Sequence, residues 1–591
     1  MITVTINDTP LTVPEGTTIL EAARQGGIRI PTLCHMEKRP PLGACRVCLV
    51  EVAGAKTLMA ACATPVTDRM TVHTHSARAR AARRQVVELL LSEHDGNCTT
   101  CDRNRSCELR TLADELGVAR LPDAGGARAA PHRDESTPAL VRDAAKCIKC
   151  RRCVTACAEV QGVGALFPQG RGFDTVIGPA FTRDLADVAC VQCGQCAAVC
   201  PVGAIVEKSH VEAVWAALAD PAKTVIVQTA PAIRAALGEE FGFEPGTRVT
   251  GKMTAALRRL GFNAVFDTNF AADLTILEEG TELLTRLKQA LVQKQPAALP
   301  MFTSCSPGWI RFAEFYFPEF LPNLSTCKSP QQMFGAVAKT YYARKIGKSA
   351  QEMVVVSVMP CTAKKFEAQR PEMNASGVRD VDYVLTTREL ARMIREGGID
   401  FAALPDEAMD APLGLSSGAA DIFANTGGVM EAALRTAYEI VTGRELPADN
   451  LHVSAVAGLE GIKEAALTVT GTTADWRFLE GVELRVAVAH GLGNARRLLN
   501  RIKAGDAAYH FVEIMTCPGG CIGGGGQPRY TDDAVRLQRI AGIYAEDEGK
   551  PIRKSHDNPD LQKLYREFLK APLGETSHHL LHTHYQSTPP V

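Results

Sequence analysis

Cysteine is the residue type that most constrains this chain. It occurs 20 times in 591 residues, and 15 of these cysteines lie before residue 201. The chain does not open with the charged, apolar and small-residue pattern of a secretory signal, so a cytoplasmic location is expected. In a reducing cytosol, clustered cysteines indicate metal ligands rather than disulfides.

Length and charge narrow the class of protein further. A chain of 591 residues predicts several domains, and 46% hydrophobic residues suffice for large cores. The 65 basic residues nearly cancel the 66 acidic ones, so no nucleic-acid partner is indicated. The basic stretch at 78–84 is expected on a solvated helix face. No apolar run reaches the roughly 18 residues of a membrane span.

The N-terminal segment predicts a small β-rich fold with one helix. Residues Ile2–Ile6 alternate in polarity and are followed by Leu11–Val13, which indicates a β-hairpin. Residues 18–21 form a capping box that opens a short helix. A second helix is expected over 79–93, and 120–140 has the composition of a linker.

The chain changes character after residue 210. Strand-like runs alternate with helical patterns, which is typical of an α/β domain. These runs are Thr224–Val227, Met353–Val358 and Leu484–Ala489.

The first cysteine motif has four thiols with a close central pair. This spacing suits a 2Fe–2S cluster, although four thiolates serve zinc equally well. Its members are Cys34, Cys45, Cys48 and Cys62.

The second motif combines one imidazole with three thiols. Taken alone, this set favours zinc, and a 4Fe–4S cluster with a histidine ligand is the alternative that the neighbouring motifs favour. Its members are His94, Cys98, Cys101 and Cys107.

The third motif is the run Cys-x2-Cys-x2-Cys-x3-Cys, which occurs twice. In such pairs the fourth cysteine of each run binds the cluster of the other run. One 4Fe–4S cubane is therefore assigned to Cys147, Cys150, Cys153 and Cys200, and the other to Cys190, Cys193, Cys196 and Cys157.

Four of the five remaining cysteines lie in three unusual segments. These are Thr303–Trp309, Met359–Glu367 and the glycine-rich Glu513–Pro528. Glycine lets the backbone approach a cofactor closely. Met301, Met359 and Met515 lie near these cysteines and would keep a shared pocket apolar if buried.

These three segments resemble the signature loops of FeFe hydrogenases, and the N-terminal motif order is similar to that of the large clostridial-type enzymes. The resemblance implies a multidomain α/β protein with a β-grasp 2Fe–2S ferredoxin-like domain and a large two-lobed catalytic domain. The implied domains are 1–78 (2Fe–2S), 79–125 (4Fe–4S with one histidine), 138–209 (two 4Fe–4S clusters), 210–530 (catalytic) and 531–591 (a helical tail that resembles a small subunit).

The family's active cluster, the H-cluster, is a 4Fe–4S cubane joined to a two-iron subsite with carbonyl, cyanide and a bridging dithiolate amine. By resemblance, Cys361, Cys517 and Cys521 bind the cubane, and Cys521 bridges to the subsite. Lys364 would donate to a cyanide. The implied pocket residues are Ala230, Pro231, Ala232, Ser329, Gln331, Met359, Phe423 and Met515.

The first loop departs from the family pattern of two adjacent cysteines. Cys305 stands at the proton-transfer position, but Ser306 stands where the fourth cubane ligand is expected. Ser306 could bind through oxygen, Cys305 could take the ligand position, or three cysteines could hold the cubane. Serine oxygen is a poor ligand for iron–sulfur clusters.

The resemblance also implies a proton route through Arg286, Glu282, Ser325 and Glu279 to Cys305. Taken alone, residues 278–282 would be interpreted as a solvated helix face. Cys327 is expected to be a small core residue. The histidines between 578 and 584 are expected in a surface tail that packs on the catalytic domain, with a metal tract as the less favoured alternative.

The implied activity is reversible reduction of protons to H2, fed through one 2Fe–2S and three accessory 4Fe–4S clusters. The electron partner is a ferredoxin or an NAD(P)-linked flavoprotein subunit, because Gly523–Gly526 follows a cysteine motif and is no dinucleotide fingerprint. H-cluster maturation proteins are further implied partners. A redox sensor or electron relay with an impaired H-cluster is the rival hypothesis, and Ser306 is the feature that favours it.

Overall fold

The N-terminal region is a five-stranded sheet with one helix packed on it. The computed structural model describes residues 1–118 and 132–588. The expected hairpin is confirmed, and Thr18 and Glu21 form the expected capping box. The strand order is β2-β1-β5-β3-β4. The elements are β1 (Ile2–Ile6), β2 (Thr9–Val13), α1 (Ile19–Gln25), β3 (Leu49–Val52), β4 (Met59–Ala60) and β5 (Met70–His73).

A long helix, α2 (Ala77–Glu93), connects this sheet to the next cysteine segment and confirms the helix expected there. Its arginines are exposed as expected except Arg83, which is buried because it donates two hydrogen bonds to the carbonyl of Leu49. The helix α3 (Glu108–Glu115) follows. Most of the linker expected at 120–140 lies outside the described residues.

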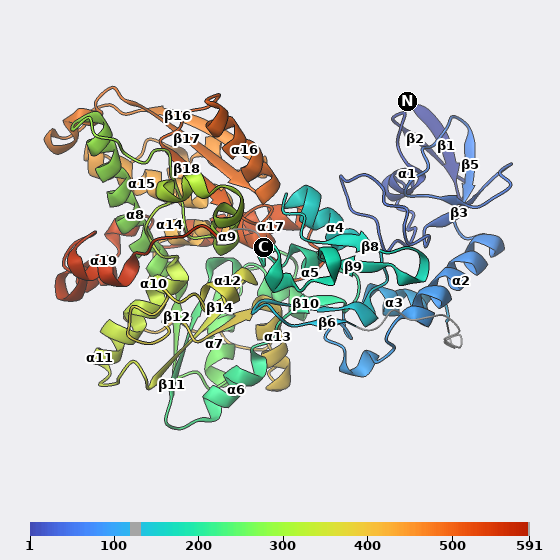
Figure 1. Ribbon diagram of the computed structural model, residues 1–591, viewed down its shortest axis with the longest axis horizontal. Helices are drawn as coiled ribbons and strands as arrows, with labels where there is room; N and C mark the ends of the chain where they lie inside the picture. The colour runs from blue at the N-terminus through green and yellow to red at the C-terminus, as the bar shows by residue number, and fades with distance from the viewer. Residues whose placement is uncertain (119–131, 589–591) are drawn as a thin grey trace.

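The last part of that expected linker is a strand pair instead. β6 pairs with β7, and β7 pairs antiparallel with β10. This three-stranded sheet carries the two cysteine runs and lies between the N-terminal sheet and the rest of the chain (Figure 1). The elements are β6 (Arg133–Asp134), β7 (Leu140–Asp143), α4 (Arg152–Thr155), β8 (Phe167–Gln169), β9 (Val176–Gly178), α5 (Gln195–Val199) and β10 (Ile205–Glu207).

The large C-terminal part contains two four-stranded sheets. The first is wholly parallel, in the order β12-β11-β14-β15, and the expected strands at 224 and 353 form its centre. Helices cover both faces, which is why all seven residues of β14 are buried. The elements are α6 (Val211–Ala219), β11 (Thr224–Thr229), α7 (Thr250–Arg259), β12 (Ala264–Asp267), α8 (Thr268–Leu291), α10 (Pro330–Val337), α11 (Ala343–Lys345), β14 (Met353–Met359), α12 (Ala363–Glu367), β15 (Tyr383–Thr386) and α13 (Thr387–Glu396).

The second sheet has the order β13-β18-β17-β16, and only its edge strand β16 is antiparallel to its neighbour. The third expected strand is its β17. The elements are β13 (Met301–Phe302), α9 (Pro307–Tyr316), α14 (Gly418–Asp421), α15 (Gly428–Thr442), β16 (Ile462–Thr468), β17 (Glu483–His490), α16 (Leu492–Ala504) and β18 (Phe511–Met515).

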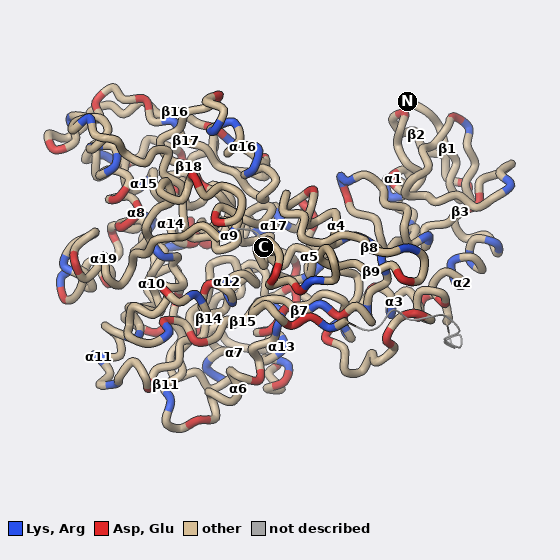
Figure 2. Tube along the Cα trace, in the orientation of Figure 1, with Lys and Arg blue, Asp and Glu red and all other residues tan. Residues whose placement is uncertain are grey.

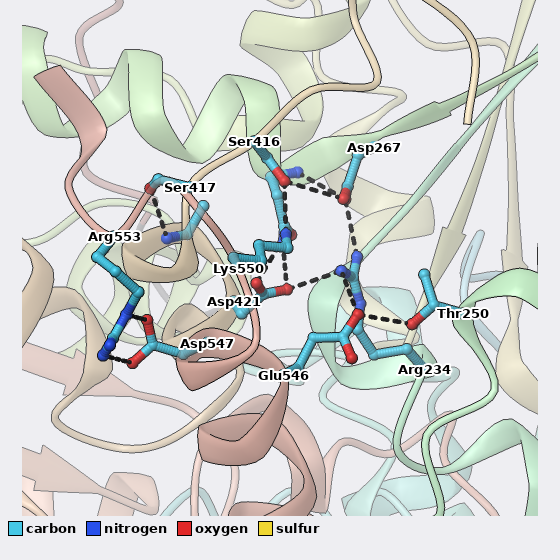
Figure 3. A network of polar contacts seen from close by, with 12 residues as sticks. Arg234, Thr250, Asp267, Ser416, Ser417, Asp421, Glu546, Asp547, Lys550 and Arg553 are labelled. Atoms are coloured by element: carbon cyan, nitrogen blue, oxygen red, sulfur yellow. Dashed lines mark hydrogen bonds and ion pairs between the residues drawn. The ribbon is translucent and has the colours of Figure 1, made fainter. Parts of the chain in front are cut away.

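Three helices complete the chain: α17 (Asp533–Glu548), α18 (Pro559–Leu564) and α19 (Glu575–Leu581). A buried polar network ties α17 to the first sheet (Figure 3). At its centre, Arg234 donates to Asp421 at 2.7 Å and to Asp267 at 2.8 Å. Arg234 also lies 3.9 Å from Glu546 of α17, so this helix is packed into the same fold as the first sheet.

Acidic and basic residues are interspersed over the whole trace (Figure 2), in keeping with the balanced composition. Among the described residues, no helix is both long and apolar enough to cross a bilayer.

Candidate active site

Four of the chain's strands end at one cavity of about 730 Å³. Ala230 follows β11, Cys361 follows β14, and Cys305 and Cys517 follow β13 and β18. In open α/β sheets, ligands bind at the carboxyl ends of the strands, so two sheets serve one site here. The lining includes the residues Ala230, Pro231, Cys305, Ser306, Gln331, Met359, Cys361, Lys364, Phe423, Met515, Cys517 and Cys521.

Three of the residues expected near this cavity do not line it. Met301 is buried, but it packs in a separate cluster with Met430 and Phe511. The backbone carbonyl of Ala232 accepts a hydrogen bond from Gln527. The third, Ser329, is buried with its hydroxyl on a carboxylate instead of the cavity.

That carboxylate is Glu367, a residue within the second loop to which the sequence alone gave no role. Glu367 receives an ion pair from Lys364 at 2.9 Å and a hydrogen bond from Gln331 at 3.0 Å. The ammonium of Lys364 also donates to the carbonyl of Cys305 at 3.1 Å. The three-residue spacing of Lys364 and Glu367 on one helix was the signal for this pair. Glu367 holds the ammonium at the cavity wall.

Ser306 lies on the same wall and is held by Thr516, a second residue that sequence reasoning missed. Its hydroxyl lies 2.7 Å from that of Thr516 and accepts the Thr516 backbone N–H at 3.2 Å. Thr516 directly precedes Cys517. The two hydroxyls therefore connect the first loop to the third.

Two glycines explain the composition of the third loop. Gly520 has φ +93°, and a Cβ there would lie 2.6 Å from the backbone nitrogen of Thr426. A Cβ on Gly525 would collide with the carbonyl of Cys193, a cysteine of the second run. The loop is glycine-rich because its backbone packs against other backbone on both sides.

The predicted proton-route residues form one connected chain. Arg286 donates to Glu282 at 2.6 Å, and Ser325 donates to the other oxygen of Glu282 at 3.1 Å. Ser325 also lies close enough to Glu279 to lower its pKa, and Glu279 in turn lies close enough to Cys305 to raise the pKa of that thiol. Both glutamates are buried, so the solvated helix face expected for this segment in isolation is wrong. Helix α8 is covered there by α10 and the C-terminal tail.

The electrostatics of this chain favour a protonated Glu279. Burial, followed by the charge of Glu282, raises the pKa of Glu279 to about 8. Burial also raises the pKa of the Cys305 thiol well above its usual value. Both groups should therefore be mainly protonated at neutral pH. Cys305 lines the cavity, and Glu279 lies close enough to interact with its thiol.

The cysteines of the third motif group as the interleaved pattern requires. One cavity of about 400 Å³ is lined by Cys147, Cys150, Cys153 and Cys200. Burial and the charge of Cys157 raise the pKa of the Cys190 thiol to about 12, so Cys157 lies with the second run.

The thiols of the first motif also converge, and the histidine of the second motif is buried. The thiol of Cys34 contacts those of Cys45 and Cys62, and Cys62 contacts Cys48. His94, at the end of α2, is buried and hydrogen-bonds the backbone of Lys146. Its Nδ1 has no hydrogen-bond partner within the described part of the chain. A histidine ligand typically has one ring nitrogen in a hydrogen bond and the other free for metal.

Taken together, these features define a multidomain redox enzyme with cysteine-rich cluster sites that lead to a buried cavity. Residues 223–525 match the family model of the iron-only hydrogenase large subunit, C-terminal domain, and 533–588 match the iron hydrogenase small subunit. The N-terminal matches are a 2Fe-2S iron-sulfur cluster binding domain (1–77), an NADH-ubiquinone oxidoreductase-G iron-sulfur binding region (83–121) and a 4Fe-4S dicluster domain (146–204).

Individual proteins agree with these matches. The chain is 54% identical to the NADP-reducing hydrogenase subunit HndD of Solidesulfovibrio fructosivorans, over 99% of both chains. It is 40% identical to iron hydrogenase 1 of Clostridium pasteurianum, over 99% of this chain and 100% of that one. A solved structure of apo [FeFe]-hydrogenase HydA1 from Chlamydomonas reinhardtii superposes with a TM-score of 0.58 and 46% identity, covering 64% of this chain and 99% of that one.

The chain belongs to the iron-only, or FeFe, hydrogenase family. It is a hydrogenase with accessory iron–sulfur domains, as the resemblance of its loops and motifs predicted.

Proposed function

We propose that the cavity holds the H-cluster, with Cys361, Cys517 and Cys521 as cubane ligands and Cys521 as the bridge to the two-iron subsite. The observation that carries this assignment is the convergence of these three thiols, with Lys364, on a wall that is otherwise mainly apolar. Thiolates are the usual ligands of iron–sulfur clusters, and an apolar wall keeps water away from the bound cluster. When bound, this cluster supplies the redox chemistry that interconverts protons and H2.

Three alternatives exist for the fourth position of the cubane. Ser306 or Cys305 could supply the ligand, or three cysteines could hold the cubane without a fourth. Ser306 lies on the cavity wall, but its hydroxyl is already paired with Thr516. Cys305 lies close enough to Glu279 for ionisation of that carboxyl to affect the thiol, which suits the proton-transfer role assigned to Cys305. These contacts favour a cubane held by three cysteines, with Ser306 as a neighbouring hydrogen-bonding group.

Proton delivery is assigned to the chain from Arg286 to Cys305. Arg286 fixes the Glu282 carboxylate, Ser325 bridges the two glutamates, and Glu279 passes a proton toward Cys305. A route of titratable groups in hydrogen-bond contact serves a site that bulk water does not reach.

Electron delivery is assigned to one 2Fe–2S and three 4Fe–4S clusters in the cysteine motifs, with His94 as one ligand. Two hydrogen bonds support a short distance for the last electron transfer, from the second cysteine run to the cavity. Gln195 donates to the carbonyl of Gly523 at 3.0 Å, and Thr362 donates to that of Gln192 at 2.8 Å. The second cysteine run thus packs directly on two active-site loops.

The electron partner is proposed to be a set of NAD(P)-linked flavoprotein subunits, because a relative covering the whole chain is named an NADP-reducing hydrogenase subunit. A ferredoxin partner is the second candidate. Maturation proteins, a cytoplasmic location, the β-grasp and two-lobed descriptions and the domain limits 1–78, 79–125, 138–209, 210–530 and 531–591 remain predictions.

The partner assignment is tested with anaerobically matured protein. Reduced viologen should drive H2 evolution by this chain alone, whereas NADPH should do so only after flavoprotein subunits are added. Oxidation of NADPH by the chain alone would contradict the assignment, because it would require a nicotinamide site on this chain. Direct and efficient exchange with reduced ferredoxin, without any gain from flavoprotein subunits, would favour the second candidate.

A further inference from the structure

Three buried arginines lie close together beside the cavity that contains Cys200. Arg103 belongs to the second cysteine motif, Arg388 to α13, and Arg529 directly follows the third active-site loop. We call these three residues the arginine cluster. The neighbouring cavity is the first cubane site, which is lined by Cys147, Cys150, Cys153 and Cys200.

Two of these arginines bind the carboxyl end of α5, which leads into Cys200. Arg103 donates to the backbone carbonyl of Cys200 at 2.8 Å, and Arg529 donates to that of Ala197 at 2.6 Å. Cys200 is the cysteine of the second run that is assigned to the first cubane. Backbone hydrogen bonds therefore fix two positive charges next to a cubane ligand.

The arginine cluster has more positive charge than its neighbours offset. Arg388 donates two hydrogen bonds to the Glu207 carboxylate, at 2.7 and 2.9 Å, and Arg529 lies 3.6 Å from the same group. In the described part of the chain Arg103 has carbonyl acceptors but no ion pair, and its Nε has no partner. Burial, followed by the charges of Arg388 and Arg103, lowers the pKa of Arg529 to about 9. Three guanidiniums thus share one carboxylate.

The second cubane site has less positive charge beside it. Arg311 donates to the carbonyl of Cys190 at 3.2 Å, and no other guanidinium of the described residues donates to a cysteine of this site. The first site has, besides the arginine cluster, the buried Arg142 in its own wall. The second cubane site is formed by Cys157, Cys190, Cys193 and Cys196.

This difference in charge affects reduction of the two clusters. Reduction of an iron–sulfur cubane adds one electron and no proton, so the cluster gains one negative charge. Positive charge that water screens poorly stabilises the reduced form and raises the reduction potential. The arginine cluster is buried and therefore acts on the first cubane with little screening.

We propose that the arginine cluster raises the reduction potential of the first cubane above that of the second, so that the first cubane retains an electron between deliveries to the active-site cavity. The electron arrives from the external electron partner through the outer clusters. It leaves toward the second cysteine run, which packs on the active-site loops. The proposal rests on the proposed cluster assignment.

A redox titration of the matured holoenzyme, followed by electron paramagnetic resonance, measures the potential of each cluster. Cys200→Ser identifies the signal of the first cubane. At the potential where the unmodified protein has equal amounts of reduced and oxidised first cubane, Arg529→Met should lower that ratio at least about tenfold. Arg529→Lys keeps the charge and should retain most of the ratio. The matched control Arg311→Met should lower the potential of the second cubane alone.

Glu207→Gln separates the effect of charge from that of structure. This change removes the negative charge that offsets the arginine cluster, so it should raise the ratio, whereas Arg529→Met lowers it. Structural damage would move both variants in the same direction. Arg103→Met gives the same test from a different segment if Arg529→Met does not fold, and thermal unfolding and iron content verify each variant.

Three results would overturn the proposal. They are an unshifted first cubane in both Arg529→Met and Arg103→Met, equal shifts of both cubanes in these variants, and a first cubane with a lower potential than the second in the unmodified protein. Absence of the first cubane's signal from unmodified, iron-loaded protein would overturn the cluster assignment, and the proposal with it.

Discussion

Replacement of Glu279 by glutamine removes one titratable group from the middle of the proton route and leaves its shape nearly unchanged. Burial, and then the charge of Glu282, raises the pKa of this carboxyl from 4.5 to about 8. One pKa unit corresponds to about 1.4 kcal/mol, so ionising Glu279 is about 5 kcal/mol less favourable in the folded protein than in the unfolded chain.

The sign of the pH dependence follows from the raised pKa. The stability that Glu279 contributes is fully present below pH 4.5 and is lost as the pH rises through about 8. Glu279→Gln has no carboxyl to ionise, so its stability should not fall in this way. The difference between the thermal unfolding midpoints, variant minus unmodified protein, should therefore increase as the pH rises over this window.

Activity and infrared spectra give two further readouts. Because an amide cannot relay a proton, Glu279→Gln should lower H2 evolution by about 10²–10⁴-fold, and Glu279→Asp should recover part of the rate. The infrared band of a protonated carboxylic acid should titrate near pH 8 and be missing in the variant. A band that titrates near 4.5, or a variant with full activity, would refute the reasoning.

Three other substitutions test the site and its support. Arg234→Met should lower the free energy of unfolding by about 3–5 kcal/mol, because it removes the ion-pair partner of the buried Asp267 and leaves the buried Asp421 with Lys550 alone. The half-exposed control Arg248→Met should cost less than about 1 kcal/mol. Thermal unfolding measures both, and equal effects would contradict the network. Lys364→Met should leave the buried Glu367 carboxylate without its ion-pair partner and should reduce the amount of two-iron subsite seen by infrared spectroscopy. An unchanged amount of subsite would contradict the role proposed for Lys364. Ser306→Cys should shift the cubane's electron paramagnetic resonance signal and potential; an unchanged cubane would place Ser306 away from the cluster.

The cluster motifs were predictable from sequence because their ligands are close in the chain and their spacing is itself a geometric constraint. The interleaved grouping of Cys200 with the first run followed from spacing alone, and the cavity lined by these cysteines agrees with it. The α/β class of the region after residue 210 was predictable for a similar reason. Short apolar runs indicate buried strands and a 3.6-residue period indicates helices, and both patterns are visible within a few neighbouring residues.

Contacts between distant segments were not predictable in this way. Thr516 meets Ser306 across 210 residues, and His582 meets Thr326 across 256. Glu278 looked like part of a solvated face because nothing in its neighbourhood shows that the C-terminal tail covers it. Arg83 is a similar case, because it is buried by hydrogen bonding to the carbonyl of Leu49, 34 residues away, while its basic neighbours are exposed.

The central claim is that the cavity lined by Cys361, Cys517 and Cys521 holds a cluster with a two-iron subsite. Infrared spectroscopy of anaerobically matured protein tests it most directly, because bound carbon monoxide and cyanide give stretching bands that accessory clusters lack. We predict these bands together with H2 evolution from reduced viologen. Matured protein that carries its accessory clusters but shows neither the bands nor turnover would contradict the claim.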